Sequence, residues 1–207
     1  MDLPHLLGAI ASGALATVGI RGATEEPRYE VVGRIGEVEV RRYAPRIAAE
    51  TVVTIQDEEK ARNEGFRRVA RYIFGGNASE AQVAMTAPVV QAAAGQQIAM
   101  TAPVVQSPSA GGWRIQFLMP ASYTMETLPK PLDGTVRLVP VPARTYAVIR
   151  FTGSRSPQAM QAQQARLRAA VAQTEWVVTG GAENWMYDPP WTVPFTRRNE
   201  VALPVGR

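Results

Sequence analysis

The stretch that decides the fold reads Asp57-Glu-Glu-Lys-Ala-Arg-Asn-Glu-Gly-Phe-Arg-Arg-Val-Ala-Arg-Tyr-Ile-Phe-Gly-Gly76. Asp57 is a suitable helix N-cap, and the two glutamates after it are favourable at the positive end of the helix dipole. Apolar residues follow at helical spacing from Phe66 to Phe74, and the pair Gly75-Gly76 is typical of a helix end. The sequence therefore predicts an amphipathic helix that begins after Asp57.

Two strand patterns precede this helix. Val38 and Val40 alternate with charged residues, which indicates a half-buried strand. Pro45 interrupts the pattern, and the run from Ile47 to Ile55 is typical of the next strand. Residues 37–76 are thus predicted to form two strands followed by a helix.

The same order of elements recurs in residues 136–173. Strand-like runs occupy 136–141 and 144–151, and Ser156-Pro157 then supplies an N-cap and a first-turn proline for a second helix. Strands grouped with only two helices favour an α+β fold over an alternating βαβ fold. We therefore expect two pseudo-equivalent halves whose sheets join around a shared core.

A separate, local repeat lies in the link after the first helix. Ala84-Met-Thr-Ala-Pro-Val-Val-Gln91 is written again as Ala99-Met-Thr-Ala-Pro-Val-Val-Gln106. Proline has no N–H for a strand ladder and is confined to sheet edges, strand starts and bulges. Each octapeptide is therefore predicted to be an edge strand or a bend.

Composition excludes several classes of protein. A chain of 207 residues with 46% hydrophobic and 19% charged residues can bury a core and is not disordered. The absence of cysteine excludes disulfides, thiolate haem ligation and iron–sulfur clusters. The net charge is +4, but no basic run is interleaved with aromatic residues, so we expect no nucleic-acid partner.

The N-terminal residues 3–20 carry no charge and are rich in alanine, glycine and leucine. Such a segment is compatible with a signal peptide, an anchor or a peripheral helix that contacts a membrane. We therefore divide the chain into an apolar leader, residues 1–28, and a domain, residues 29–207. The localisation stays open between cytoplasmic and membrane-associated or exported.

Four motifs in the domain occur in a fixed order. They are Gly75-Gly76 at the predicted helix end, Met100-Thr-Ala-Pro-Val104, Tyr187-Asp-Pro-Pro190 and Arg197-Arg-Asn-Glu200. In these motifs the chain resembles the SOUL haem-binding protein family, and the similarity runs from about Tyr29 to Val205.

The resemblance implies a distorted antiparallel β-barrel flanked by two helices. It also implies a carrier or buffer that binds haem or a related tetrapyrrole non-covalently, in an apolar cleft beside the first helix. A basic position of that helix in the family matches Arg71, and another matches Asn63, which is uncharged. The expected haem contacts are Arg62, Asn63, Phe66, Arg67, Ala70, Arg71, Met85 and Met100, with Arg67 and Arg71 facing the propionates.

An axial ligand for the haem iron is harder to find. The only histidine of the chain is His5 in the leader, so the domain cannot supply an imidazole. Met85 and Met100 carry thioethers and Tyr72 a phenol, but methionine more often fills gaps in apolar pockets. We therefore expect tetrapyrrole binding without a histidine ligand and no separate metal site.

Catalytic motifs are absent from the sequence. It contains no Gly-x-Ser-x-Gly elbow, no His-Glu-x-x-His and no phosphate-binding glycine loop. We therefore do not expect an enzyme. The alternative is a small-ligand sensor or hydrolase on the same scaffold, which a buried, unpaired glutamate in the cleft would favour. A third possibility is an interaction module tethered by the leader.

Overall fold

The first helix begins where the sequence predicts it, and the second does so too. In this computed structural model, which describes residues 24–78, 95–189 and 191–207, Asp57 accepts a hydrogen bond from the backbone N–H of Lys60 at 2.9 Å. Ser156 accepts one from Ala159 at 3.2 Å. The helices that follow these caps are α2 (Glu58–Ile73) and α3 (Pro157–Val171).

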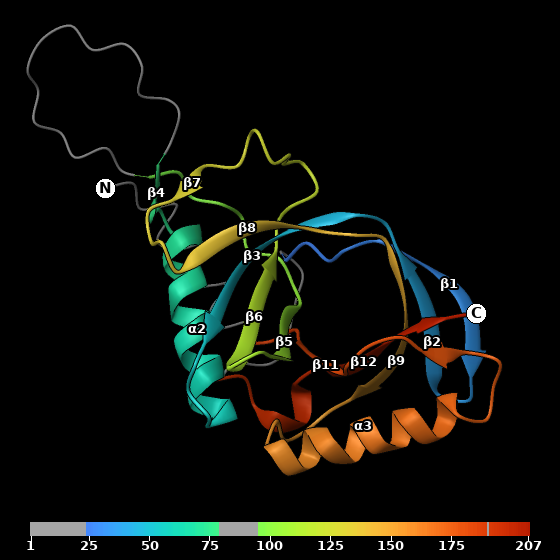
Figure 1. Cartoon of the computed structure of the whole chain (residues 1–207). Helices are drawn as coiled ribbons and strands as arrows, with labels where there is room; N and C mark the ends of the chain where they lie inside the picture. Colours follow the sequence, from blue (N-terminus) through green and yellow to red (C-terminus); the bar gives the residue numbers. More distant parts are fainter. Residues whose placement is uncertain (1–23, 79–94, 190) are drawn as a thin grey trace, which may run out of the picture.

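Among the described residues, ten strands form a large antiparallel sheet, and the short strands Asn77–Ala78 and Lys130–Pro131 form a separate two-stranded sheet, so the predicted α+β class is confirmed (Figure 1). In the first part of the chain they are β1 (Tyr29–Ile35), β2 (Val38–Tyr43), β3 (Arg46–Val53), β4 (Asn77–Ala78), β5 (Val104–Ser109) and β6 (Gly112–Leu118). In the second part they are β7 (Lys130–Pro131), β8 (Val136–Val141), β9 (Arg144–Phe151), β10 (Val177–Val178), β11 (Glu183–Met186) and β12 (Asn199–Gly206). A 3₁₀ turn, η1 (Pro194–Thr196), precedes β12.

The predicted duplication is visible in the pairing of these strands. The first half runs β2, β3, α2, β5, β6, and the second runs β8, β9, α3, β11, β12. β3 pairs with β6 as β9 pairs with β12, and β5 pairs with β6 as β11 pairs with β12. Three strand pairs join the two halves to each other: β2–β9, β3–β8 and β5–β11. This pattern is that of a pseudo-two-fold axis at the β5–β11 pair.

The sheet is a distorted barrel that stays open. Its strand order is β1-β2-β9-β12-β11-β5-β6-β3-β8, so β1 and β8 are the two edges of the path. Figure 1 shows the sheet curving, with α2 beside one half and α3 beside the other. The expected barrel with two flanking helices is therefore present in an open form.

Side chains alternate between two faces of the sheet, as the pleat requires. On the helix-covered face, one core cluster lies under α2 around Phe117 and another under α3 around Leu203. On the opposite face a third cluster is rich in aromatic residues, and its rings make edge-to-face contacts. The rings in contact are those of Tyr43, Tyr146 and Trp185, and Tyr187 belongs to the same cluster.

One prediction about the repeat is wrong. The second octapeptide, Ala99–Gln106, enters the sheet at Val104, and β5 pairs with β11 on one side and with β6 on the other. An internal strand can follow Pro103 because this proline lies just before the first ladder position, where its missing N–H breaks no ladder bond. The first octapeptide lies outside the described residues.

The segment before β1 contacts the domain although the sequence assigns it to the leader. The carbonyl of Glu25 accepts a hydrogen bond from the N–H of Ala102 at 2.9 Å. Residues 3–20 lie outside the part of the chain that the structure describes. Within the described part, neither helix has the length and apolar composition needed to cross a bilayer.

Candidate functional site

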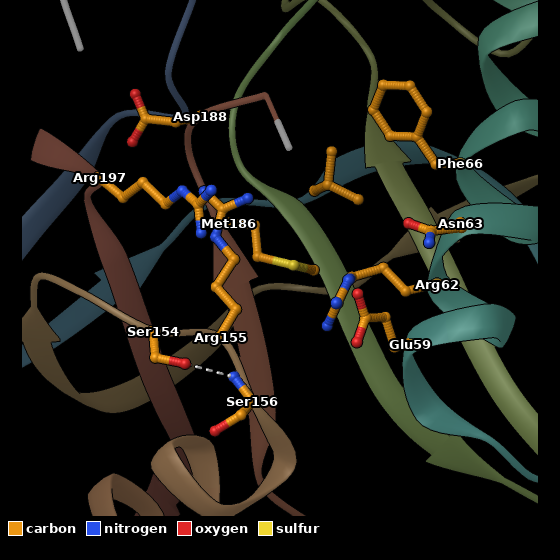
Figure 2. A pocket seen from close by; sticks show the side chains of 11 residues that line it. Glu59, Arg62, Asn63, Phe66, Ser154, Arg155, Ser156, Met186, Asp188 and Arg197 are labelled. Carbon is orange, nitrogen blue, oxygen red and sulfur yellow. Dashed lines mark hydrogen bonds between the residues drawn. The ribbon is translucent and has the colours of Figure 1, made fainter. Parts of the chain in front are cut away.

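A cleft of about 310 Å³ opens where the N-terminal turns of α2 and α3 approach β5 and β11. Residues from both halves line it, together with the segment between β11 and β12 (Figure 2). They are Glu59, Arg62, Asn63, Phe66, Val104, Ser154, Arg155, Ser156, Met186, Asp188 and Arg197. We call this space the cleft.

Helix α2 supplies the first wall. Glu59, Arg62, Asn63 and Phe66 share one side of the helix because they are three to four residues apart. The ring of Phe66 packs against Phe117 with centroids 5.2 Å apart, which anchors this side of the helix to the sheet. Burial lowers the pKa of the Arg62 guanidinium, and Glu59 and Glu58 oppose this by raising it. Arg62 remains a cation at neutral pH.

The second wall is the turn that leads into α3. Arg155 is 8% exposed, and its Nε donates a hydrogen bond to Oδ1 of Asn199 at 2.7 Å. Ser156 Oγ caps α3, and Ser154 Oγ accepts a hydrogen bond from the N–H of Ser156 at 3.1 Å (Figure 2). The turn therefore holds the Arg155 side chain in a fixed place beside β12.

The segment between β11 and β12 closes the cleft. Asp188 accepts a hydrogen bond from the N–H of Arg198 at 2.6 Å, which ties the two ends of this segment together. Arg197 donates from Nε to the carbonyl of Thr192, also at 2.6 Å. The motifs at 187–190 and 197–200 are thus adjacent in space, and Asp188 and Arg197 line the cleft.

The arrangement favours an apolar ligand with anionic groups. Phe66, Val104 and Met186 supply apolar surface, and the side chains of three arginines point into the space around Met186 (Figure 2). These arginines are Arg62, Arg155 and Arg197. Guanidinium groups form bidentate, charge-assisted hydrogen bonds with carboxylates. Two carboxylates, of Glu59 and Asp188, also line the cleft, so the balance of charge is positive.

The structure places only part of the predicted contact set in the cleft. Arg62, Asn63 and Phe66 line it. Arg67 and Arg71 lie on the exposed side of α2, where Arg67 is 73% exposed and pairs with Glu64.

The remaining predicted contacts lie elsewhere. Ala70 follows Phe66 by one turn, is half-buried and does not line the cleft. Met100 is 38% exposed and also outside it, and Met85 lies outside the described residues. Arg155, Asp188 and Arg197 were missed because no local pattern joins them to α2. The position of Asp188 and Arg197 within the closing motifs could have pointed to these two residues, whereas Arg155 carries no such signal in the sequence.

Neither a metal site nor a phenolate ligand is evident in the described residues. Among them, no group of three His, Cys, Asp or Glu side chains could hold a metal ion. Tyr72 faces the core and donates its hydroxyl to the carbonyl of Pro129 at 2.9 Å. Burial raises the pKa of Tyr72 to about 12, so its phenol stays protonated at neutral pH.

The buried Glu200 and two half-buried glutamates lie outside the cleft, and each has partners. Glu183 accepts hydrogen bonds from the Tyr146 hydroxyl at 3.2 Å and from Trp185 Nε1 at 3.0 Å, and burial raises its pKa. Glu58 accepts one from Asn184 at 3.2 Å, and burial likewise raises its pKa. Among the described residues, the glutamate that lines the cleft is the exposed Glu59.

Solved structures share this fold at low sequence identity. The C-terminal domain of EcmrR is 11% identical with a TM-score of 0.56, over 86% of this chain and 98% of that chain. A hydrolase from Listeria innocua is 11% identical with a TM-score of 0.51, over 84% and 94%. At this identity the similarity supports the fold alone. No curated protein matches the chain.

A family model also matches most of the chain. The family described as SOUL heme-binding protein matches residues 24–204, which include both halves and every residue that lines the cleft. Both closing motifs, which position Asp188 and Arg197, fall within this range. The chain therefore belongs to the SOUL haem-binding protein family.

Proposed function

We propose that this protein is a non-enzymatic carrier or buffer that binds haem or a related tetrapyrrole in the cleft beside α2. Membership of the SOUL family supports tetrapyrrole binding in general terms. The observation that supports the cleft as the binding site is that apolar side chains and three guanidinium groups line it together. A tetrapyrrole presents the complementary chemistry, an apolar macrocycle with carboxylate side chains.

In this proposal the macrocycle packs against Phe66, Val104 and Met186. Its propionates meet Arg62 and the arginines at the opposite wall, Arg155 and Arg197. Since Arg155 is held by Asn199 and Arg197 by the Thr192 carbonyl, these cations need little ordering on binding. Residues 24–207 contain neither histidine nor cysteine, so we propose that affinity comes from the macrocycle and the propionates.

Catalysis is not part of the proposal. The two serines of the cleft, Ser154 and Ser156, engage their hydroxyls in capping the start of α3. A serine nucleophile also needs an adjacent base, and no histidine occurs in residues 24–207. A sensor or hydrolase role would be favoured by an unpaired buried glutamate in the cleft, and Glu59 is exposed. We therefore put forward no second function.

The test is a titration of the full chain with haemin and, in parallel, with iron-free protoporphyrin, followed by Soret absorbance. The wild type is compared with Arg62→Glu, which puts a negative charge beside the propionates, and with Arg71→Glu on the exposed side of the same helix. We expect saturable one-to-one binding of both ligands. We expect Arg62→Glu to weaken it by about tenfold or more, which corresponds to about 1.4 kcal/mol, and Arg71→Glu to change it little.

Three results would count against this function or its position. Lack of saturable binding of either ligand excludes the tetrapyrrole function. Binding of haemin alone points to an iron ligand that the proposal does not include. If Arg71→Glu weakens tetrapyrrole binding and Arg62→Glu does not, the site lies on the exposed side of α2. The resemblance of Arg71 to a basic position in the family predicts that placement.

A further inference from the structure

A second cavity, of about 580 Å³, lies at the other end of β3 from the cleft. The start of β3, the end of β6 and the segment Glu25–Arg28 enclose it, and it shares no residue with the cleft. Its volume falls within the range of roughly 300–1,000 Å³ that small-molecule pockets occupy. Thr101, from the motif at residues 100–104, also lines this cavity.

The walls of the second cavity are held in place by hydrogen bonds and an ion pair. Glu25 accepts from the backbone N–H of Ala102 with its carbonyl and from that of Ala121 with its carboxylate, both at 2.9 Å. Glu26 accepts two hydrogen bonds from Arg198, each also at 2.9 Å. The segment Glu25–Arg28 is therefore fixed across the mouth, and a ligand would pay little to order it.

Most of the lining is apolar and rigid. Prolines and aliphatic side chains predominate, among them Pro27, Pro45, Ile47, Leu118, Met119 and Pro120. Proline has no rotatable side chain, so these walls lose little conformational entropy when a ligand packs against them. The lining suits an apolar body larger than a single side chain.

Two cations interrupt this apolar lining. Arg28 and Arg46 line the second cavity, and neither forms an ion pair with any residue that the structure describes. The guanidinium of Arg46 lies over the Tyr43 ring at 4.6 Å, and its Nε is buried without a hydrogen-bond partner. Arg46 interacts electrostatically with the Glu183 carboxylate but forms no ion pair with it, and its buried Nε without a hydrogen-bond partner favours an anionic ligand.

The acidic residues of the second cavity are paired with groups other than these two cations. Glu26 forms an ion pair with Arg198, which it shares with Glu200. The Glu25 carboxylate accepts the hydrogen bond from the Ala121 N–H. The lining therefore carries two arginines and two glutamates, and both glutamates are engaged by other groups, whereas neither arginine is in an ion pair with a residue that the structure describes.

We propose that the second cavity is a binding site for an amphipathic carboxylate, with the apolar body between the prolines and the carboxylate at Arg46 and Arg28. Long-chain fatty acids and the propionates of a tetrapyrrole share this chemistry. The site is independent of the cleft, so it stands or falls separately from the proposed function.

The test uses cis-parinarate, a fluorescent long-chain fatty acid, titrated into the full chain, with its methyl ester as the ligand that lacks the charge. We expect saturable binding of the acid and binding of the ester that is weaker by about tenfold or more. Arg46→Met keeps an apolar side chain of similar reach and removes the cation, so it should weaken the acid to the level of the ester. Arg62→Glu, which alters only the cleft, should leave parinarate binding unchanged.

A second variant, Ala121→Trp, keeps the test valid if Arg46→Met fails to fold. Ala121→Trp fills the mouth from an exposed position and keeps the backbone N–H that Glu25 accepts, so it should block parinarate while the chain unfolds as the wild type does. If iron-free protoporphyrin displaces parinarate from the wild type but not from Arg46→Met, the tetrapyrrole is the occupant. If it does not displace parinarate, the occupant belongs to the fatty acid class. Equal binding of acid and ester, no saturable binding, or weakening by Arg62→Glu overturns the proposal.

Discussion

The two halves of the molecule share one topology but place different residues at equivalent positions. Gln116 of β6 and Glu200 of β12 each lie opposite the central residue of the β5–β11 pair, which is Val105 in one half and Trp185 in the other. Gln116 is half-buried, whereas Glu200 is fully buried. Strand pairing uses the backbone, so the duplicated fold tolerates this exchange of side chains.

The two helices differ in the same way. Gly65 of α2 and Gln164 of α3 follow their N-caps at the same distance, yet Gly65 is buried against Ile115 and Gln164 reaches Asn184. Helix α2 also presents Arg62 and Phe66 to the cleft, while α3 contributes only the turn at its start. The two halves therefore share one scaffold, but they contribute different side chains to the lining of the cleft.

The largest effect is expected at the equivalent pair on β6 and β12. Glu200 binds Arg41 at 2.8 Å and Arg198 at 2.9 Å, and it accepts from the Tyr187 hydroxyl at 2.8 Å. Glu200→Ala leaves Arg41 and Arg198 only their second carboxylates, Glu39 and Glu26, and it also removes the acceptor of the buried Tyr187 hydroxyl. It should lower the free energy of unfolding by about 3–5 kcal/mol. Gln116→Ala should cost only about 0.5–1.5 kcal/mol, since it removes one hydrogen bond. Urea denaturation measures both, and equal losses would refute the asymmetry.

The next effect concerns the equivalent helix positions. A Cβ at Gly65 would lie 2.7–2.9 Å from side-chain atoms of Ile115, so Gly65→Ala should destabilise by about 1–3 kcal/mol through overpacking. In an open helix the same change would stabilise by about 1 kcal/mol, so the sign of the effect is informative. Gln164→Ala, the control on α3, should cost about 1 kcal/mol at most. A rise in melting temperature for Gly65→Ala would show that α2 does not pack this closely.

The smallest effect is expected at Glu183, the first residue of β11. Its equivalent in the first half is Pro103, because Trp185 and Val105 are equivalent and each lies two residues further along the chain. Burial raises the pKa of Glu183 above 4.5, so the folded state holds this proton more tightly than the unfolded state. The contribution of Glu183 to stability is therefore greatest at low pH and falls as the pH rises from about 4.5 through the folded pKa. Glu183→Gln removes this dependence.

Denaturation of the wild type and Glu183→Gln at several pH values checks the prediction. The free energy of unfolding of the wild type, minus that of the variant, should decrease as the pH rises and then level off. A difference that increases with pH would mean that hydrogen bonds from Trp185 and Tyr146 outweigh burial.

The scaffold could be predicted from the sequence because its signals are local. Asp57 and Ser156 cap their helices as expected, and the recurrence of two strands and a helix predicted the two halves. The place of Val104 in the sheet could not be predicted, because pairing on both sides of β5 depends on strands distant in the chain.

The cleft was predictable on one wall only. Helical spacing joins Arg62 to Phe66, so a pattern on α2 finds both. Arg155 is placed at the cleft by the pairing of β9 with β12, and Arg197 by the path of the segment after β11. These contacts join residues distant in the chain, so no sequence periodicity predicts them. Helical spacing also could not separate Arg67 from Arg62, since the side of α2 that faces the cleft is set by tertiary packing.

Amide chemical-shift mapping with iron-free protoporphyrin tests most directly whether a tetrapyrrole lies in the cleft. We expect the largest shifts at Asn63, Phe66 and Met186, together with the turn at 154–156, and smaller shifts along the exposed side of α2. Largest shifts at Thr101 and at 118–121 would place the tetrapyrrole in the second cavity instead. That result, or the lack of any localised shift, would contradict the position proposed for the ligand.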